Sequence, residues 1–107
     1  MRDNIKGGAL TETTFFILLS LYSPNHGYGI MQFISNETQE RLTLGAGTLY
    51  GAINTLLKKG WIEPFGDDDG RKKEYIITKL GKSIAQMELQ RIKQLSETAT
   101  RIMEGVK

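Results

Sequence analysis

Apolar residues recur at helical spacing in three segments of the first half of the chain. The first segment opens at Thr11 with polar residues able to cap a helix, and it ends before the Ser-Pro pair at 23–24. Its apolar positions cover most of the helix circumference, which predicts a location at the centre of the domain or between two subunits. Residues 24–27 (Pro-Asn-His-Gly) interrupt the chain, and a second helix follows that ends near residues 38–41.

The third segment has an apolar back and a polar front. Gly45 and Gly47 mark a turn before it, and the residues at 58–60 (Lys-Lys-Gly) supply a basic last turn with a glycine stop. Its apolar stripe contains Leu49, Ile53, Leu56 and Leu57. The opposite face is small, polar and cationic, so it can approach a duplex closely. This face carries Gly47, Thr48, Gly51, Asn54, Thr55 and Lys58.

The second half of the chain predicts a β-hairpin and then a long helix. Residues 61–65 and 73–78 are short, aromatic and β-branched, and a polar, glycine-bounded loop separates them. Thr78 caps the final helix, whose apolar residues 92, 95, 99, 102 and 106 step by three and four. This seam has too few neighbours within one subunit to cover it, which predicts a partner helix.

Composition excludes several classes of site. The 107 residues are 39% hydrophobic and 24% charged, as expected for one globular domain. The absence of cysteine excludes disulfides, thiolate metal sites and cysteine nucleophiles, and His26 is the single histidine. We therefore expect neither an enzyme of the common hydrolytic kinds nor a metal or other cofactor. The apolar run 15–21 is too short to span a bilayer, and the N-terminus lacks a signal-peptide cleavage pattern, so we expect a cytoplasmic protein without membrane contact.

The charge is unevenly distributed along the chain. The formal net charge is +2, yet residues 41–82 contain eight basic and five acidic residues, whereas residues 1–40 contain two basic and four acidic ones. The basic excess therefore coincides with the third helix and the hairpin. A bias of this size by itself says little about nucleic acid.

The order helix, helix, helix, hairpin, long helix predicts a winged helix-turn-helix with a C-terminal dimerisation helix. The fold class is mostly α with a small β-hairpin. Residues 1–78 form the DNA-binding domain, and residues 79–107 form the dimerisation helix, which packs with the first helix in a single structural unit. The major groove of DNA admits one α-helix, and the third helix has the apolar back and polar front that insertion requires.

Each candidate DNA-contacting residue has a physical role in this arrangement. Polar side chains on the third helix can hydrogen-bond to base edges or phosphates, and its terminal lysines can contact phosphates. Tyr50 borders the apolar stripe, so packing and phosphate contact are equally open. Cations on the hairpin would meet the flanking minor groove. The candidates are Thr48, Tyr50, Asn54, Thr55, Lys58, Lys59, Arg71, Lys72 and Lys73.

Two further sets of residues follow from the unpaired seam and the first helix. Expected dimerisation residues are Phe15, Phe16, Ile84, Met87, Ile92, Leu95, Ala99 and Ile102. The expected lining of a pocket for a small hydrophobic effector is Phe15, Phe16, Met87 and Leu89.

Several motifs resemble those of the PadR family of bacterial transcriptional regulators. They are Gly-Thr-Leu-Tyr at 47–50, Gly-Arg at 70–71 followed by Tyr75 and Thr78, and His-Gly-Tyr-Gly-Ile at 26–30. The resemblance runs from about residue 11 to the C-terminus. It implies a homodimeric repressor that binds a roughly palindromic operator and is released by a small molecule or another signal. The single final helix is similar to the short-tailed branch, some members of which bind flat aromatic drugs between the subunits.

The chain departs from the family pattern at two positions. Gly51 stands where a proline usually follows the Gly-Thr-Leu-Tyr motif, and the one tryptophan, Trp61, opens the first hairpin strand instead of lying in the final helix. Two other classes of function remain open. The winged domain and final helix can form a protein-interaction module without DNA binding, or a drug-binding dimer without a regulatory role.

Overall fold

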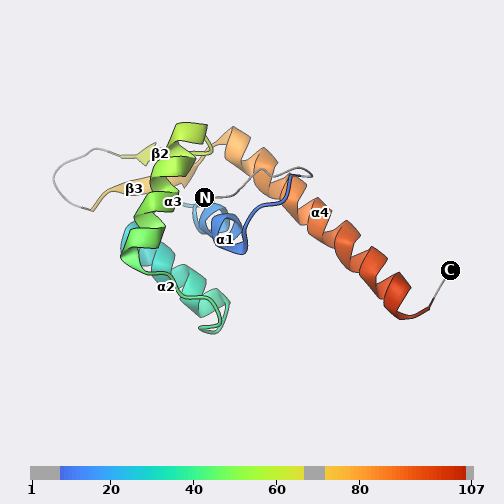
Figure 1. Ribbon diagram of the computed structural model, residues 1–107. Helices are drawn as coiled ribbons and strands as arrows, with labels where there is room; N and C mark the ends of the chain where they lie inside the picture. Colours follow the sequence, from blue (N-terminus) through green and yellow to red (C-terminus); the bar gives the residue numbers. More distant parts are fainter. Residues whose placement is uncertain (1–7, 67–71, 106–107) are drawn as a thin grey trace.

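The chain folds into four helices and a small antiparallel sheet, and the computed structural model describes residues 8–66 and 72–105 (Figure 1). The predicted order of three helices, a hairpin and a long helix is confirmed. The elements are α1 (Glu12–Ser20), β1 (Asn25–His26), α2 (Gly27–Glu37), α3 (Ala46–Lys59), β2 (Ile62–Phe65), β3 (Glu74–Ile77) and α4 (Lys79–Met103).

The sheet contains one strand more than the predicted hairpin. Its order is β1-β3-β2, with both pairs antiparallel. Asn25 lies opposite Tyr75 and His26 opposite Glu74, so residues that were predicted to interrupt the chain form a short strand instead. His26 has extended backbone angles because it caps α2, and this conformation suits pairing with the open edge of β3. The wing, which is the hairpin of β2 and β3 with the residues between them, is thereby attached to the start of α2.

Local capping defines the helix ends at three positions. Thr11 caps α1 by accepting a hydrogen bond from the backbone N–H of Thr14, at 3.1 Å. Thr78 caps α4 in the same way, accepting from Gly81 at 3.0 Å, as predicted. Gly60 ends α3 with φ of 75°, a left-handed conformation that glycine adopts without a Cβ penalty. Gly47 was expected in the turn before α3 but lies in its first helical turn.

The core forms where α1, α2 and α3 meet and the sheet covers them. The largest fully buried apolar side chains are contributed by all three helices, by the residue that follows α1 and by β2: Ile17, Leu18, Leu21, Ile30, Ile34, Leu49, Ile53, Leu56 and Ile62. Backbone hydrogen bonds join distant segments, with the N–H of Ile77 donating to the carbonyl of Leu21 at 2.9 Å. The helix α1 contacts both α2 and α4, in agreement with its predicted central position.

The helix α4 begins against the core and then projects from it. Gly81, Ala85 and Glu88 are buried in its first half, whereas the described residues from Ile92 onward are exposed except for the half-buried Ala99. Figure 1 shows the C-terminal half of this helix, in orange and red, extending away from the other elements. The molecule is accordingly elongated, 59 Å along its longest axis.

Candidate nucleic-acid interface

The helix α3 presents a polar face to solvent, as its sequence pattern predicts. Leu49, Ala52, Ile53 and Leu56 are buried on its inner side. The outer side exposes Gly47, Thr48, Tyr50, Gly51, Asn54 and Lys58, and Thr55 is half-buried. A Cβ built at Gly47 or Gly51 would meet no atom within 4 Å, so this part of the helix surface is open. A second backbone can therefore approach α3 closely here.

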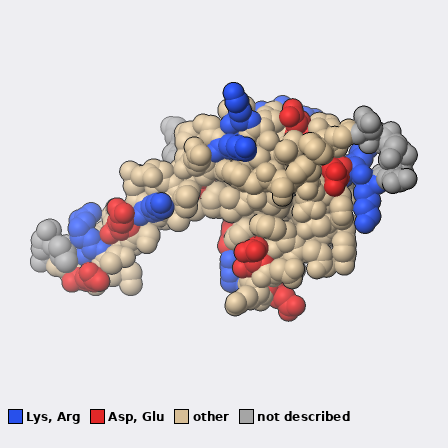
Figure 2. Space-filling view, turned by 180° about the vertical axis from the view of Figure 1, so that it is seen from behind, with Lys and Arg blue, Asp and Glu red and all other residues tan. Residues whose placement is uncertain are grey.

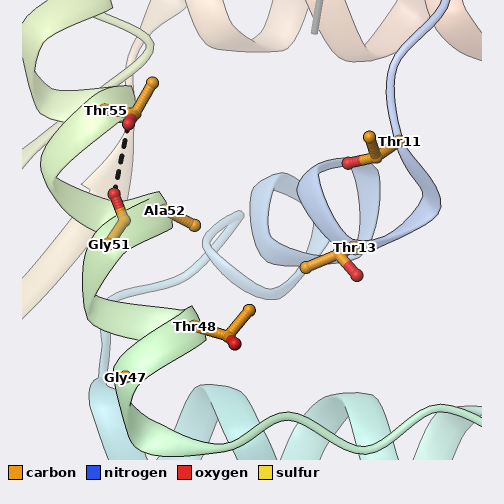
Figure 3. A pocket seen from close by; sticks show the side chains of 7 residues that line it. All are labelled: Thr11, Thr13, Gly47, Thr48, Gly51, Ala52 and Thr55. Atoms are coloured by element: carbon orange, nitrogen blue, oxygen red, sulfur yellow. Dashed lines mark hydrogen bonds between the residues drawn. The ribbon is translucent and has the colours of Figure 1, made fainter. Parts of the chain in front are cut away.

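The outer face of α3 borders grooves on both of its flanks. Thr48 and Thr55 line one of about 520 Å³, which faces Thr11 and Thr13 at the start of α1 (Figure 3). The Thr55 hydroxyl donates to the carbonyl of Gly51 at 3.2 Å, the bond drawn as a dashed line in Figure 3. Tyr50 and Asn54 border the other side, toward the wing. The predicted contact residues are thus divided between two flanks of one helix.

Tyr50 is both exposed and packed. Its side chain is 47% exposed, yet a Cβ at Gly27 would overlap its hydroxyl, so the phenol lies directly against the backbone at the start of α2. Together with Tyr28 and Tyr75, it lines a pocket of about 280 Å³ that also includes His26, Gly27, Lys72 and Lys73. The structure therefore joins the start of α2, the face of α3 and the wing at one place.

The start of α2 is held by two polar side chains that were not predicted as site residues. Nδ1 of His26 accepts a hydrogen bond from the backbone N–H of Gly29 at 3.1 Å, which caps the helix. The Asn25 side chain accepts from the backbone N–H of His26 at 2.9 Å. Tyr28 is 61% exposed beside this cap. The His-Gly-Tyr motif at 26–28 was the sequence signal that identified this region.

The lysines at the end of α3 and on the wing have different surroundings. Lys58, Lys72 and Lys73 are exposed. Lys59 is half-buried, with its ammonium 5.0 Å from the centre of the Trp61 ring, a cation–π contact at the junction of helix and wing. Arg71, also predicted to contact DNA, lies outside the described residues.

Charged side chains are sparse in the middle of the face that Figure 2 shows. Figure 2 shows basic side chains beside the grey atoms of the wing and alternating basic and acidic side chains along the protruding end of α4. Glu12 and Arg41 form an exposed ion pair that joins α1 to the segment after α2. The hydrogen bond from Arg41 lowers the pKa of Glu12, despite some burial that opposes the shift.

The predicted dimerisation residues divide between the core and the surface. Phe15, Phe16 and Ile84 are half-buried and pack against the core of the same chain. The remaining residues lie farther along α4 and are mostly exposed. Met87 is 64% exposed, Ile92 36%, Leu95 58% and Ile102 65%, and Ala99 is half-buried.

A pocket lies between α1 and α4, and only part of the predicted effector set lines it. Its volume is about 370 Å³, and Leu10, Phe15, Phe16 and Ile92 supply the aromatic and aliphatic lining. The two phenyl rings have centroids 6.5 Å apart. Met87 and Leu89 do not line this pocket and are exposed on α4.

The buried carboxylate of Glu88 also lines this pocket. Glu88 is 3% exposed and forms a two-pronged ion pair with Arg91, at 2.9 and 2.6 Å. It also accepts a hydrogen bond from the backbone N–H of Leu10 at 3.3 Å, which attaches the segment before α1 to α4. The hydrogen bond to Glu88 raises the pKa of Arg91. Sequence periodicity gave no signal for this contact.

Residues 8–66 and 72–105 contain neither a metal-binding cluster nor a membrane-spanning helix. No group of three or more acidic or histidine side chains in these ranges is arranged to hold a metal ion. No helix in the same ranges combines the length and apolarity needed to cross a membrane.

Comparison with known proteins identifies the family. Residues 17–87 match the model of the transcriptional regulator PadR-like family. Protein X of Lysinibacillus sphaericus, itself uncharacterized, is 34% identical over 99% of this chain and 98% of its own length. A transcriptional regulator from Clostridium thermocellum superimposes with a TM-score of 0.65 at 28% identity, over 90% of this chain and 93% of its own.

A solved complex with DNA shares the fold. Bacillus subtilis PadR, crystallised with operator DNA, has a TM-score of 0.63 and 22% identity, over 74% of this chain and 47% of its own. The shared arrangement is the winged helix that the order of elements predicted. Because the family model matches residues 17–87 and covers more than half of the chain, the chain belongs to the PadR-like family of transcriptional regulators.

Proposed function

We propose that this protein is a homodimeric transcriptional repressor that binds a roughly palindromic operator in double-stranded DNA. The observation that carries the proposal is the exposed polar face of α3 beside the exposed lysines of the wing. An α-helix with this face fits the major groove, and the wing then lies over the adjacent minor groove. The protein acts in the cytoplasm as a regulator and not as an enzyme.

Individual residues have separate roles in this docking. Asn54 and Thr48 hydrogen-bond to base edges and so contribute sequence discrimination. Lys58, Lys72 and Lys73 contact phosphates, which fixes the register of the helix without reading sequence. The half-buried position of Lys59 against Trp61 supports a role in joining α3 to the wing, with a secondary contribution to the electrostatic field.

Dimerisation supplies the second half-site. The exposed apolar seam of α4 supports pairing with a second copy, because an isolated helix with such a seam leaves large apolar side chains in water. A two-fold dimer presents two recognition helices to a palindrome. The pocket of Phe15, Phe16 and Ile92 lies beside this seam, so a small hydrophobic effector bound there would favour one spacing of the two winged domains over another.

The test is fluorescence anisotropy with labelled DNA from upstream of the protein's own gene, with unrelated competitor, at two salt concentrations. We expect saturable binding that survives competitor and weakens with salt. Lys58→Ala should weaken binding on every sequence and reduce the salt slope by about 0.9 for each phosphate that is no longer neutralised. Asn54→Ala should change the ranking of operator variants instead. Lys93→Ala is the matched control, since Lys93 is exposed on the half of α4 that projects away from α3 and the wing.

Two results would count against the proposal. Absence of binding at low salt would favour the alternative of a protein-interaction module built on the same fold. Binding with identical affinity and salt slope in Lys58→Ala and Lys72→Ala would exclude this docking orientation.

A further inference from the structure

We propose that the groove between α3 and the wing holds one sugar–phosphate strand of the bound duplex, with the Phe65 ring against a deoxyribose. Phe65 is thereby a DNA-contacting residue that the polar and basic candidates did not include. The inference rests on the proposed function, because it requires α3 in the major groove. It adds an apolar contact to the backbone, which is distinct from base reading and from charge attraction.

The groove is formed by two elements that would lie on opposite sides of a backbone strand. Its volume is about 350 Å³. Asn54 and Leu57 line it from α3, and Phe65 and Lys73 line it from the wing. The major and minor grooves of a duplex are separated by a single sugar–phosphate strand. A helix in one groove and a wing over the other must therefore enclose that strand between them.

The lining matches the chemistry of that strand. Deoxyribose presents an apolar carbon face, and each phosphate carries a negative charge. Leu57, Pro64 and Phe65 supply apolar surface, whereas Lys73 supplies a cation. A groove with purely apolar lining would not suit a phosphate, and one with only lysines would not suit a sugar.

The exposure of Phe65 is the observation that sequence patterning leaves unexplained. Its side chain is 45% exposed, although phenylalanine at a strand position is usually packed. It lies opposite Glu74 in the sheet register, so its cross-strand neighbour is a charged residue and not another apolar one. Contact with a deoxyribose would remove this apolar surface from water, which is favourable.

The carboxylate of Glu74 lines the same groove and opposes phosphate binding. Because Glu74 lies opposite Phe65 in the sheet, its negative charge disfavours a phosphate at the Phe65 end of the groove. The uncharged sugar is therefore favoured there. Replacing this carboxylate with a neutral isostere should therefore strengthen DNA binding.

Hydroxyl-radical footprinting tests the contact directly, because the radical attacks deoxyribose. The full-length protein is saturated on labelled DNA from upstream of its own gene. We expect a short protected stretch on the strand between the major-groove and minor-groove contacts. Phe65→Ala, also at saturation, should lose protection there while the rest of the footprint remains. Unchanged protection in a bound Phe65→Ala complex would overturn the inference.

The salt dependence separates an apolar contact from an electrostatic one. Phe65→Ala should weaken binding by about fivefold, with an unchanged slope of log K against log salt. Lys73→Ala should weaken binding and reduce that slope by about 0.9 for the phosphate that it neutralises. Leu80→Ala is the matched control, because Leu80 is 51% exposed but lies in the first turn of α4. A changed slope in Phe65→Ala, or equally weakened binding in Leu80→Ala, would contradict the assignment.

Two further measurements distinguish failure of this inference from misfolding of a variant and from failure of the proposed function. Glu74→Gln should bind more tightly than wild type, and it tests the groove even if Phe65→Ala does not fold. Weaker or equal binding by Glu74→Gln would contradict the placement of the strand. Wild-type protein that binds no DNA at low salt would overturn the proposed function itself, whereas binding that is insensitive to Phe65 overturns this inference alone.

Discussion

The phenol of Tyr50 lies directly on the backbone of Gly27, so that any side chain at position 27 would overlap it. These residues are far apart in the chain, on α3 and α2, and their contact places the phenol against the start of α2. The side chain of Tyr50 on α3 is thus positioned by a glycine in α2. Tyr50 also borders the pocket beside the wing.

Gly27→Ala is expected to displace Tyr50 more than it destabilises the fold. The overlapping atoms belong to the far end of a side chain that is 47% exposed, and this ring can turn toward solvent. The free energy of unfolding should change by less than about 1 kcal/mol. DNA affinity should fall nevertheless, as measured by anisotropy. In the Tyr50→Ala background the same substitution should have little further effect on DNA affinity.

Gly81→Ala, in contrast to Gly27→Ala, should mainly destabilise the fold. A Cβ at this position would overlap the carbonyl oxygen of Trp61 and the side chain of Ile77, and a backbone carbonyl in the core cannot turn away. We expect the free energy of unfolding to fall by about 1–3 kcal/mol. Thermal unfolding at fixed protein concentration should show a Tm lower by about 5 °C or more. An unchanged Tm would mean that the start of α4 can move away from the wing.

Glu88→Ala should destabilise the attachment of the N-terminal segment to α4. The buried carboxylate accepts from Leu10 and Arg91, and its removal leaves the Leu10 N–H without this acceptor. The expected decrease in the free energy of unfolding is about 1–3 kcal/mol by chemical denaturation. Glu88→Gln, which retains an acceptor oxygen, should be destabilised less. Glu97→Ala, at an exposed position of the same helix, is the control and should be near neutral.

The ion pair of Glu12 with Arg41 should make stability depend on pH in the acid range. The pKa of Glu12 is lowered in the folded state, chiefly by its hydrogen bond with Arg41. The contribution of the pair is therefore present above the ordinary carboxyl pKa and is lost as the pH falls through the lowered value. Wild type should have a slightly higher Tm than Arg41→Gln at neutral pH, and the difference should close in acid.

Thermal unfolding of both proteins from about pH 7 to about pH 3 measures this effect. Both partners are substantially exposed, with relative side-chain accessibilities of 61% and 47%, so added salt should reduce the difference. A difference that stays constant across the pH range would show that Arg41 acts through packing and not through charge.

Leu95→Glu should abolish self-association through α4. Leu95 is 58% exposed in the apolar seam, and a carboxylate there would oppose its symmetry mate or be buried against apolar side chains. Light scattering should give twice the chain mass of 12.0 kDa for wild type and the chain mass itself for the variant. Gln94→Glu, which adds the same charge next to the seam, should remain dimeric. A wild-type mass of one chain at micromolar concentration would exclude the dimer.

Local sequence patterns predicted the elements of this protein because helix periodicity, caps and glycine stops act over a few residues. Thr11, Thr78 and Gly60 have the predicted capping roles, and the polar face of α3 follows from its spacing. The motifs at 26–30, 47–50 and 70–78 also predicted the family. Each of these signals lies within one short segment of chain.

The tertiary structure decided the relationships between segments. Residues 25–26 became a strand only because β3 offers them an open edge, and Tyr50 acquired its position from Gly27. Glu88 is buried beside Leu10, and Phe65 is exposed in a groove with Asn54, although neither pairing has a periodic signal. Such contacts depend on how distant elements pack, and the physical constraint that selects them is the shared core. The sequence by itself therefore determined the elements and the family, and only the packing of those elements determined which side chains meet.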